Sequence, residues 1–589
     1  METGIGVIDK IIARWSYGDW TPTSLYRTGL FWALFWLIIA VPGLRLKVRH
    51  WCRLNPWKSA GLTALLIFGF VFCSMWPLND VEWALVDDHE ILIELNDREK
   101  FTAADLFEKV AHHVELGGCF APEKNLARFR PAYYFLRYAE VWLWQGNPHA
   151  WGRARIFLAG FSLWLFFLAV RRLSDPLLAG MVALAVSTFP CWPDTWRYLG
   201  RAEIYAAVGM ALNLYGFALL WGTPPRLPHL SAWARRFGWG LMLLGFIIAF
   251  GSKENFIILL GPIGLVYLRD LWNRRPNGLC GHLAIAVSLG IVVGMAVVLK
   301  YKLSLSEGLD IYGRSTESSQ RLSLFLPAAK AYFLSGQGIV LLVISGAYLL
   351  LGFRNRNRNS PGMFSSIFLE IGTALGISSA VFISQYVFYV GALDNRYRFP
   401  AEFTWYLAAV GLACCMARTA RLRQFGLIAW RRSAWRALFL LAALPVLNLG
   451  PHRLTNEIII RVEQTQRFEQ FLSQVAKVCR DDPSRPVVIE ATQVFVYEPS
   501  YAMPILLKHF GVANPLYHRY APKPDLISTE SPHMYRWLVG ELTEISRDGK
   551  FGYRPWPKDH EAELGRPFVI AMDADEPITS GEWLGRAPW

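Results

Sequence analysis

Long apolar runs separated by short loops recur along most of the chain, and this pattern constrains the fold more than any other feature of the sequence. A helix needs about 20 mainly apolar residues to cross the hydrocarbon of a bilayer. Runs of roughly this length, several short enough to need tilt, predict about twelve transmembrane helices. With 53% hydrophobic and 18% charged residues, the chain is expected to be an α-helical polytopic membrane protein. The runs lie near residues 28–44, 60–77, 153–170, 177–191, 204–222, 237–251, 255–268, 280–299, 337–353, 364–390, 402–416 and 437–449.

Basic residues cluster in every second loop between these runs, as in Arg45 to Arg53, Arg171 with Arg172, and Arg354 to Arg358. The positive-inside rule makes these loops cytoplasmic, and they explain the net charge of +14. No basic stripe with interleaved aromatic residues is present, so nucleic acid is not expected as a partner. The segments then expected outside the cytoplasm are 78–152, 191–203, 251–254, 301–336, 391–402 and everything after 450.

We expect this protein in the bacterial inner (plasma) membrane. The chain has no Asn-x-Ser/Thr acceptor site, which is consistent with a bacterial source. If the run 28–44 only lies in the interface, the number of spans falls by one, but the later loops keep their sides. The cysteines have no CxxC spacing, so neither a metal site nor a disulfide framework is predicted from them.

The hydropathy falls after residue 450, which divides the chain into a transmembrane domain, 1–450, and a soluble extracytoplasmic domain, 451–589. Residues 458–478 have the pattern of a helix, and 486–490 and 567–571 that of short buried strands, so the second domain is predicted to be α/β. The triplet 573–575 reads Asp-Ala-Asp, the spacing of a metal motif in nucleotide-sugar enzymes, but we assign it to a surface turn.

The long first outer loop, 78–152, contains two predicted helices, 102–115 and 131–145. The first has an amphipathic spacing. The second begins with Pro131 at the first helical position and is rich in aromatic residues. Both are expected to lie along the membrane surface.

Asp87, Asp88, His89 and Glu90 come soon after the second run, where the chain leaves the predicted bilayer. Ionisable groups at such a boundary are costly and are therefore candidates for a functional site. Two adjacent carboxylates can raise one another's pKa and act as a general base or as cation ligands. The alternative is a helix cap or an ordinary solvated loop.

A second acid, Glu203, opens the fifth run, and Asp194 and Arg201 precede it on the same expected side of the membrane. We take them as candidates for the same site. The alternative for Glu203 is a helix stabilised by its macrodipole, an effect worth about 0.3–1 kcal/mol.

Lys253 and Glu254 lie in the tight turn between the sixth and seventh runs. An ammonium group in this position suits a phosphate or a sugar carboxylate. The alternative is a pair that neutralises itself within the turn.

Arg396, Tyr397 and Arg398 follow the tenth run, which ends near Gln385, and Pro400 is expected to open the next helix. Outer loops should be poor in arginine, so this cluster favours an anion site. Arg128 and Arg130 in the first outer loop invite the same explanation, although a loop of that length carries charge freely.

The order and sidedness of these motifs resemble the GT-C glycosyltransferase superfamily, in particular its protein O-mannosyltransferase and aminoarabinose transferase branch. The resemblance covers about 60–449 and does not extend to the terminal domain. It implies a GT-C-like fold and inverting transfer of a sugar from a polyprenyl-phosphate donor to an acceptor on the non-cytoplasmic face. The acceptor, which is a lipid, a polysaccharide or a protein, is not identified, and membrane lipids are further partners.

By this resemblance, Asp87 or Asp88 matches the first-loop acid that takes the proton of the acceptor, and Glu203, with Asp194, the second acid. Lys253 and Arg396, with Tyr397 and Arg398 beside it, match groups that hold the donor phosphate. A monophosphate leaving group needs only lysine and arginine, so no cofactor is required, while the paired acids leave room for a divalent cation. The residues expected to contact substrate are His89, Glu90, Arg128, Arg130, Asp194, Arg201, Glu254 and Gln385.

Two other functions compete with this one. A lipid-linked saccharide transporter or flippase calls for charges deep within the spans and two related halves, and the sequence has neither. An O-antigen ligase or polymerase, acting on lipid diphosphates, is expected to carry its arginines in a large late loop, whereas 391–402 is short.

Overall fold

The computed structural model describes residues 28–29, 31, 33–35, 37–38, 41–95, 100–112, 129–173, 176–221, 232–272, 278–305, 323–354, 361–388, 395–422, 453–492, 497–520, 553–555, 565–573 and 581–587. Within these residues nine helices are long and apolar enough to cross a membrane, as expected of a multi-pass membrane protein. They contain α4 (Pro56–Met75), α8 (Pro148–Leu173), α11 (Ala202–Trp221), α12 (Ala232–Ser252), α13 (Leu260–Trp272), α14 (Gly278–Leu305), α17 (Gly336–Arg354), α18 (Pro361–Phe388) and α19 (Asn395–Leu422).

These helices coincide with nine of the runs that the sequence predicts to span the membrane. The run 177–191 corresponds to a shorter apolar helix, α9 (Pro176–Thr188). The run 437–449 lies outside the described residues, as do positions 30, 32, 36, 39 and 40 of the run 28–44. Large apolar side chains face outward along the helices, as Leu279, Leu283 and Val287 do at four-residue spacing on α14, where they are 74%, 49% and 39% exposed. This is the pattern of a surface that faces lipid.

Proline is the first residue of six described helices, namely α3 (Pro42–Leu54), α4, α7 (Pro131–Trp144), α8, α9 and α18. The missing N–H of proline costs nothing at this position, and its fixed φ suits a helix. Pro400 does not follow the expectation. Because α19 begins at Asn395, Pro400 lies inside the helix close to its start.

The antiparallel helices α11 and α12 touch through glycine. A Cβ at Gly209 would lie 2.6 Å from the Gly245 carbonyl oxygen, and a Cβ at Gly245 would lie 2.4 Å from the Asn213 nitrogen. Small residues allow this close approach of two backbones in a membrane. The crossing brings the start of α11 beside the end of α12, where the candidate site forms.

The first outer loop contains the turn η1 (Trp76–Asp80) and the short helix α5 (His89–Ile93), followed by α6 (Ala103–His112) and α7. The two helices predicted in this loop are confirmed as α6 and α7, except that 113–115 lie outside the described residues. Gly251 at the end of α12 lets α7 approach closely, since a Cβ there would lie 2.7 Å from the Ala132 Cβ.

The C-terminal part begins with the long helix α21 (Arg453–Asp481) and continues into a small parallel sheet. The sheet has the order β3-β2-β1-β4-β5. Every residue of the central strand β1 is buried, as in parallel sheets covered on both faces. The predicted helix and both predicted strands are confirmed as α21, β1 and β4. The elements are β1 (Val487–Ala491), α22 (Tyr497–His509), β2 (Leu516–Tyr520), β3 (Tyr553–Pro555), β4 (Phe568–Ala571) and β5 (Glu582–Arg586).

Asp573, in the Asp-Ala-Asp triplet, closes the carboxyl end of this sheet. Its two carboxylate oxygens accept hydrogen bonds from Thr492 N at 2.9 and 2.8 Å, and Oδ2 also accepts one from Thr492 Oγ1 at 2.6 Å. This contact joins the segment after β4 to the end of β1. Asp575 lies outside the described residues.

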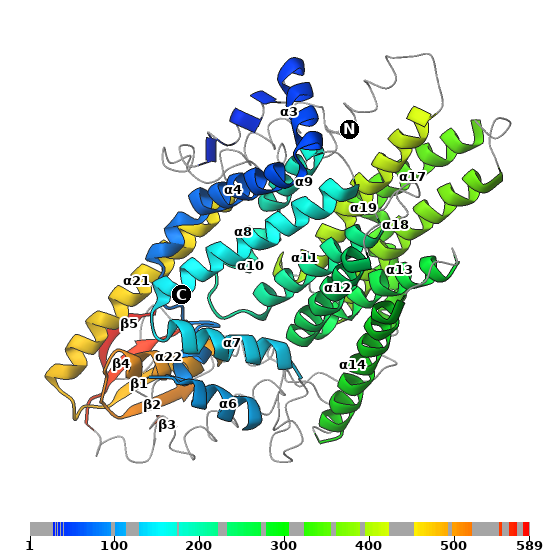
Figure 1. The fold of residues 1–589 in the computed structure, drawn as a ribbon. Coiled ribbons are helices and arrows are strands. Elements are labelled where there is room, and N and C mark those ends of the chain that lie inside the picture. The colour runs from blue at the N-terminus through cyan, green and yellow to red at the C-terminus, as the bar shows by residue number, and fades with distance from the viewer. Residues whose placement is uncertain are drawn as a thin grey trace, which may run out of the picture.

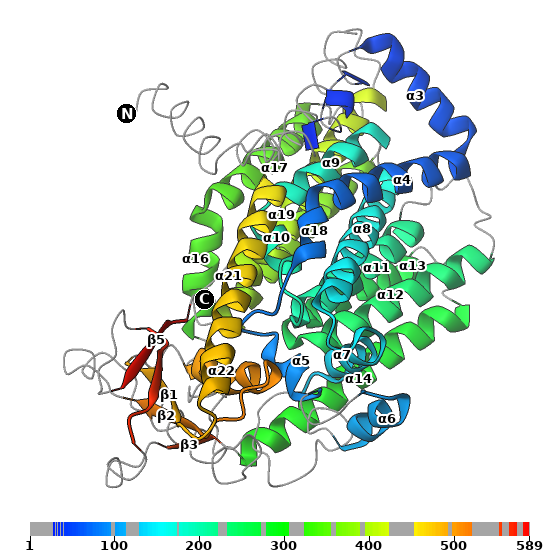
Figure 2. The same ribbon diagram turned by 90° about the vertical axis from the view of Figure 1, so that its left-hand side faces the viewer.

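The sheet, α5, α6 and α7 gather at one end of the helices, and α3 lies at the other (Figures 1 and 2). The long helix α21 bridges the two parts, because it contacts α4, α9 and α10 (Cys191–Trp196) as well as α22. Hydrogen bonds fix it to the first outer loop. Glu82 N donates to Thr465 Oγ1 at 3.2 Å, and Gln466 Nε2 donates to the Asp80 carbonyl at 3.0 Å.

Candidate functional site

The loop that leads into α5 turns sharply at Asp87, whose φ of 73° lies in the left-handed region. Aspartate tolerates this conformation better than most residues. The carboxylates of Asp87 and Asp88 have different partners: Arg201 for the first and backbone N–H groups for the second. The two acids therefore do not share one proton or one cation as an adjacent pair would.

Asp88 is 1% exposed and acts as a structural acceptor. Its Oδ2 accepts a hydrogen bond from Ala84 N at 3.0 Å, and its Oδ1 accepts bonds from Leu199 N at 3.3 Å and Gly200 N at 3.1 Å. This carboxylate joins the loop before α5 to the loop before α11.

Burial raises the pKa of Asp88 to about 6, against the opposing effects of the Arg461 charge and the backbone donors. The charge of Asp87 adds a smaller increase. The neighbouring acid is therefore a minor cause of the shift, and the main cause is the loss of water around Asp88.

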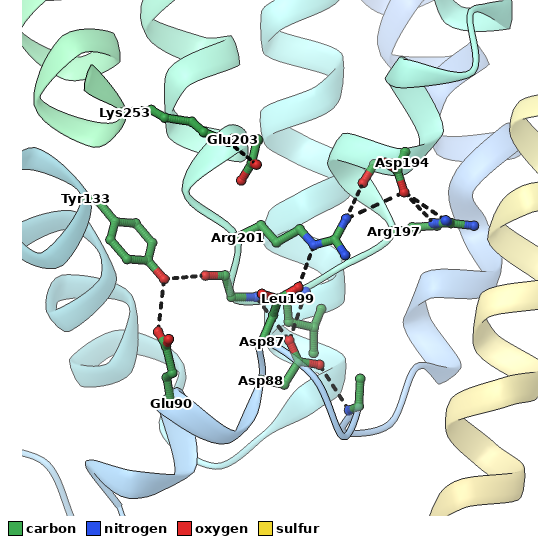
Figure 3. A network of polar contacts seen from close by, with 12 residues as sticks. Asp87, Asp88, Glu90, Tyr133, Asp194, Arg197, Leu199, Arg201, Glu203 and Lys253 are labelled. Carbon is green, nitrogen blue, oxygen red and sulfur yellow. Dashed lines mark hydrogen bonds and ion pairs between the residues drawn. The ribbon is translucent and has the colours of Figure 1, made fainter. Parts of the chain in front are cut away.

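Asp87 is more accessible, with 23% of its side chain exposed, and it forms an ion pair with Arg201. Asp87 Oδ2 lies 2.6 Å from Arg201 Nε, and Arg201 Nη1 lies 3.5 Å from Asp194 Oδ1. Asp194 also accepts a bond from Arg197 Nη2 at 2.7 Å. Figure 3 shows this alternating chain of acids and arginines, which comes from the first outer loop, from α10 and from the loop before α11.

Glu90 belongs to a second group, built around Arg137 of α7. Arg137 Nη1 forms an ion pair with Glu90 and contacts the Tyr133 hydroxyl, and Arg137 Nη2 donates to the Asp87 carbonyl at 3.2 Å. The Tyr133 hydroxyl donates to the Gly200 carbonyl at 2.7 Å. These bonds hold the backbone of Asp87 in its unusual conformation.

Gly200 allows the two loops to approach each other at this point. A Cβ at Gly200 would lie 2.7 Å from the Asp87 carbonyl oxygen and 3.0 Å from Arg137 Nη2. Any larger residue would displace the backbone of Asp87. His89, on the same short helix as Glu90, is 3% exposed, and burial lowers its pKa and favours the neutral imidazole.

Glu203 and Lys253 pair with each other across the α11–α12 crossing. Both are largely buried, at 8% and 5% exposed. Glu254 pairs with Arg130 at 3.2 Å. Thus Lys253 does not neutralise its neighbour Glu254, and each acid takes its partner from another element.

Gln385 joins α18 to the turn η2 (Glu254–Leu259), because Asn255 Nδ2 donates to Gln385 Oε1 at 2.7 Å. This buried bond places the end of α18 beside the Lys253 turn. Gln385 is 0% exposed and therefore positions the helices around the site.

The late arginine cluster is described only in part. Arg398 is exposed near the start of α19, and the ring of the next residue, Phe399, lies 6.2 Å from that of Trp192 in α10. The start of α19 is therefore at the same end of the helices as Asp194. The side chains of Arg396 and Tyr397, and the whole of Arg128, lie outside the described part of the chain.

The two adjacent acids have protein partners within the described part of the chain. Asp87 and Asp88 are engaged with Arg201 and with backbone N–H groups, and in the described residues no group of three or more His, Cys, Asp or Glu side chains is arranged to hold a metal ion. The divalent cation that the paired acids would allow stays a prediction.

Two residues of the site, Tyr198 and Arg461, were missed by sequence reasoning. Tyr198 lies between Arg197 and Arg201 in the segment before α11, and Arg461 on α21 lies against its ring, with its guanidinium carbon 4.0 Å from the ring centroid. Nothing in the local pattern distinguishes Arg461 from the other charged residues of α21, because its partner is distant in the sequence.

The chain matches no protein-family model and no curated protein sequence.

Proposed function

We propose that the protein is an integral membrane glycosyltransferase that moves a sugar from a polyprenyl-phosphate carrier to an acceptor hydroxyl on the non-cytoplasmic face. One observation carries this proposal. The accessible acid Asp87 pairs with Arg201 at the end of the helices where Glu203, Lys253 and the start of α19 also gather. A proton acceptor beside cationic groups at a membrane boundary is what transfer from a lipid phosphate needs.

The sidedness of the proposal is supported by the opposite end of the same helices, where basic residues collect. Arg171 at the end of α8 donates to Ser59 Oγ near the start of α4, at 2.6 Å. Arg235 and Arg269 both pair with Asp270, at 2.7 and 2.9 Å, where α12 begins and α13 ends. Basic helix ends favour the cytoplasm, which supports an outer position for the Asp87 end.

Asp87 is the better candidate for the base. Asp88 is buried and its carboxylate is occupied by three backbone donors, whereas part of the Asp87 side chain is exposed. A general base must come within hydrogen-bond reach of the proton it removes. We therefore assign the proton transfer to Asp87 and a positioning role to Asp88.

The proposed reaction is a single displacement. Asp87 takes the proton of the acceptor hydroxyl as its oxygen bonds to the anomeric carbon of the donor sugar. The bond between that carbon and the phosphate oxygen breaks, its electron pair stays with the polyprenyl phosphate, and the anomeric configuration inverts. Arg201 orients Asp87 through their ion pair, and Lys253 does the same for Glu203. Arg398 lies at the same end, where it can favour the leaving phosphate.

The proposal is tested by an Asp87→Asn variant reconstituted in proteoliposomes with a set of polyprenyl-phosphate sugars. We expect the wild-type protein to release polyprenyl phosphate from at least one donor and the variant to lose this turnover by about 100-fold or more, the range for a general base. The matched control is Asp105→Asn, which changes an acid of the same loop that bonds Thr102 at the start of α6. Full turnover in Asp87→Asn would remove the acid from the mechanism.

A further inference from the structure

Three arginine side chains surround one aromatic ring next to the candidate site. The guanidinium carbons of Arg201, Arg461 and Arg197 lie 3.1, 4.0 and 5.3 Å from the ring centroid of Tyr198. Burial alone would raise the pKa of Tyr198, but the three positive charges outweigh it and lower that pKa. Two of the arginines come from the segment before α11, and the third comes from α21 of the C-terminal part.

Two of these arginines already have carboxylate partners. Arg201 pairs with Asp87 at 2.6 Å, and Arg197 pairs with Asp194 at 2.7 Å and with Glu457 at 2.9 Å. Their charges are therefore largely balanced by acids of the same network (Figure 3).

Arg461 differs from both. Its Nε and Nη2 atoms are shielded from solvent, yet within the described parts of the chain neither atom has a hydrogen-bond partner. A buried guanidinium donor without an acceptor costs more than an ordinary lost hydrogen bond, because the group is charged. Burial lowers the pKa of Arg461, and the nearby charges of Arg201 and Arg197 lower it further.

Asp88 does not supply the missing acceptor. The carboxylate acts on Arg461 through its charge, but its oxygens accept bonds from Ala84, Leu199 and Gly200. Asp88 and Arg461, both among the described residues, do not form an ion pair within 4.0 Å. Within the described residues, the Nε and Nη2 donors of Arg461 thus remain available to a bound ligand.

We propose that Arg461, set against Tyr198 and flanked by Arg201, holds the phosphate group of the lipid carrier. This inference rests on the proposed function and extends it, because it makes the C-terminal part a component of the donor site. A planar guanidinium presents paired N–H groups that match two oxygens of one phosphate. The ring of Tyr198 fixes the plane of that group by a cation–π contact.

The hydrogen bonds that anchor α21 to the first outer loop suit this role. Thr465 and Gln466, about one turn beyond Arg461 on the same helix, bond the backbone of the first outer loop at Glu82 and Asp80. The same loop carries Asp87. The docking of α21 therefore sets the position of the phosphate-holding group relative to the proton acceptor.

The test measures binding of polyprenyl phosphate without a sugar, and of inorganic phosphate, by the thermal stabilisation of the detergent-solubilised full-length protein. We expect Arg461→Gln to weaken the binding of polyprenyl phosphate by about 10- to 100-fold, the loss of one charge-assisted contact. Arg461→Lys keeps the charge but lacks the paired N–H groups of the guanidinium, so it should weaken the binding of polyprenyl phosphate less. The matched control is Arg467→Gln, at an exposed position on the same helix, where the side chain is 73% exposed.

Wild-type affinity in Arg461→Gln would overturn the inference, as would binding of polyprenyl phosphate no tighter than that of inorganic phosphate. If Arg461→Gln does not fold, unchanged affinity in Arg461→Lys overturns it instead. The outcome is separable from that of the proposed function. If Arg461→Gln binds polyprenyl phosphate normally while Asp87→Asn loses turnover, only the assignment of the phosphate site is wrong. If Arg461→Gln binds more weakly while Asp87→Asn keeps full turnover, only the assignment of the base is wrong.

Discussion

The division of labour between the two adjacent aspartates predicts a graded loss of stability at Asp88. In Asp88→Asn the side-chain oxygen at the Oδ1 position still accepts from Leu199 and Gly200, and only the bond from Ala84 is lost. In Asp88→Ala all three buried donors lose their acceptor. The alanine variant therefore leaves two more buried N–H groups without an acceptor than the asparagine variant does. At about 1–2 kcal/mol for each group, its free energy of unfolding should be lower by about 2–4 kcal/mol.

The comparison uses two uncharged replacements, so the cost of burying a charge cancels. Unfolding midpoints in detergent are measured for both variants, with Asp87→Asn as the control. Turnover is measured in parallel, and Asp88→Asn is expected to keep a substantial part of it while Asp87→Asn does not. Equal midpoints for Asp88→Ala and Asp88→Asn would refute the structural role of Asp88. Loss of turnover in Asp88→Asn alone would reverse the assignment of the base.

Two further predictions concern the same loop. The pKa of Asp88 is raised from 3.8 to about 6 in the folded protein, so its protonated form stabilises the fold by about 3 kcal/mol. This contribution is full below pH ~4 and is lost as the pH rises through ~6. The free energy of unfolding of the wild type, relative to that of Asp88→Asn, should therefore fall over this range, and a constant difference would contradict the prediction. Gly200→Ala should displace the Asp87 backbone, because its Cβ would lie 2.7 Å from the Asp87 carbonyl oxygen. We expect the free energy of unfolding to fall by about 1–3 kcal/mol and turnover to decrease. A variant with the stability and turnover of the wild type would show that the contact relaxes without cost.

The helices and strands were largely predictable because their signals are local. Apolar runs of sufficient length become helices in lipid, where every backbone group must be bonded within the segment. Prolines such as Pro131 and Pro148 mark where helices begin. Pro400 shows the limit of this rule, because nothing local fixes whether the helix starts at the proline or a turn before it.

The candidate site was predictable as a set of residues but not as a set of pairs. Lys253 was expected to hold a phosphate, yet it lies against Glu203 because the glycine contacts of α11 and α12 bring their ends together. Asp87 and Asp88 look equivalent in the sequence. Their separate roles follow from one backbone angle and from donors in a loop that lies more than a hundred residues further along the chain.

Arg461 could not have been chosen from the sequence. It belongs to a charged helix outside the transmembrane part, and its relation to Tyr198 depends on how α21 docks against α10 and the first outer loop. Long-range contacts of this kind leave no periodic or motif signal, so the residue becomes a candidate only when the packing is known.

The claim that a lipid monophosphate is the natural ligand is tested most directly by native mass spectrometry of the purified full-length protein, mixed with equal amounts of polyprenyl phosphate, polyprenyl diphosphate and phospholipid. We predict that one polyprenyl monophosphate is retained after the detergent and the phospholipid have been removed in the gas phase. Preferential retention of the diphosphate, or of phospholipid alone, would contradict the account and favour a ligase or a lipid transporter instead.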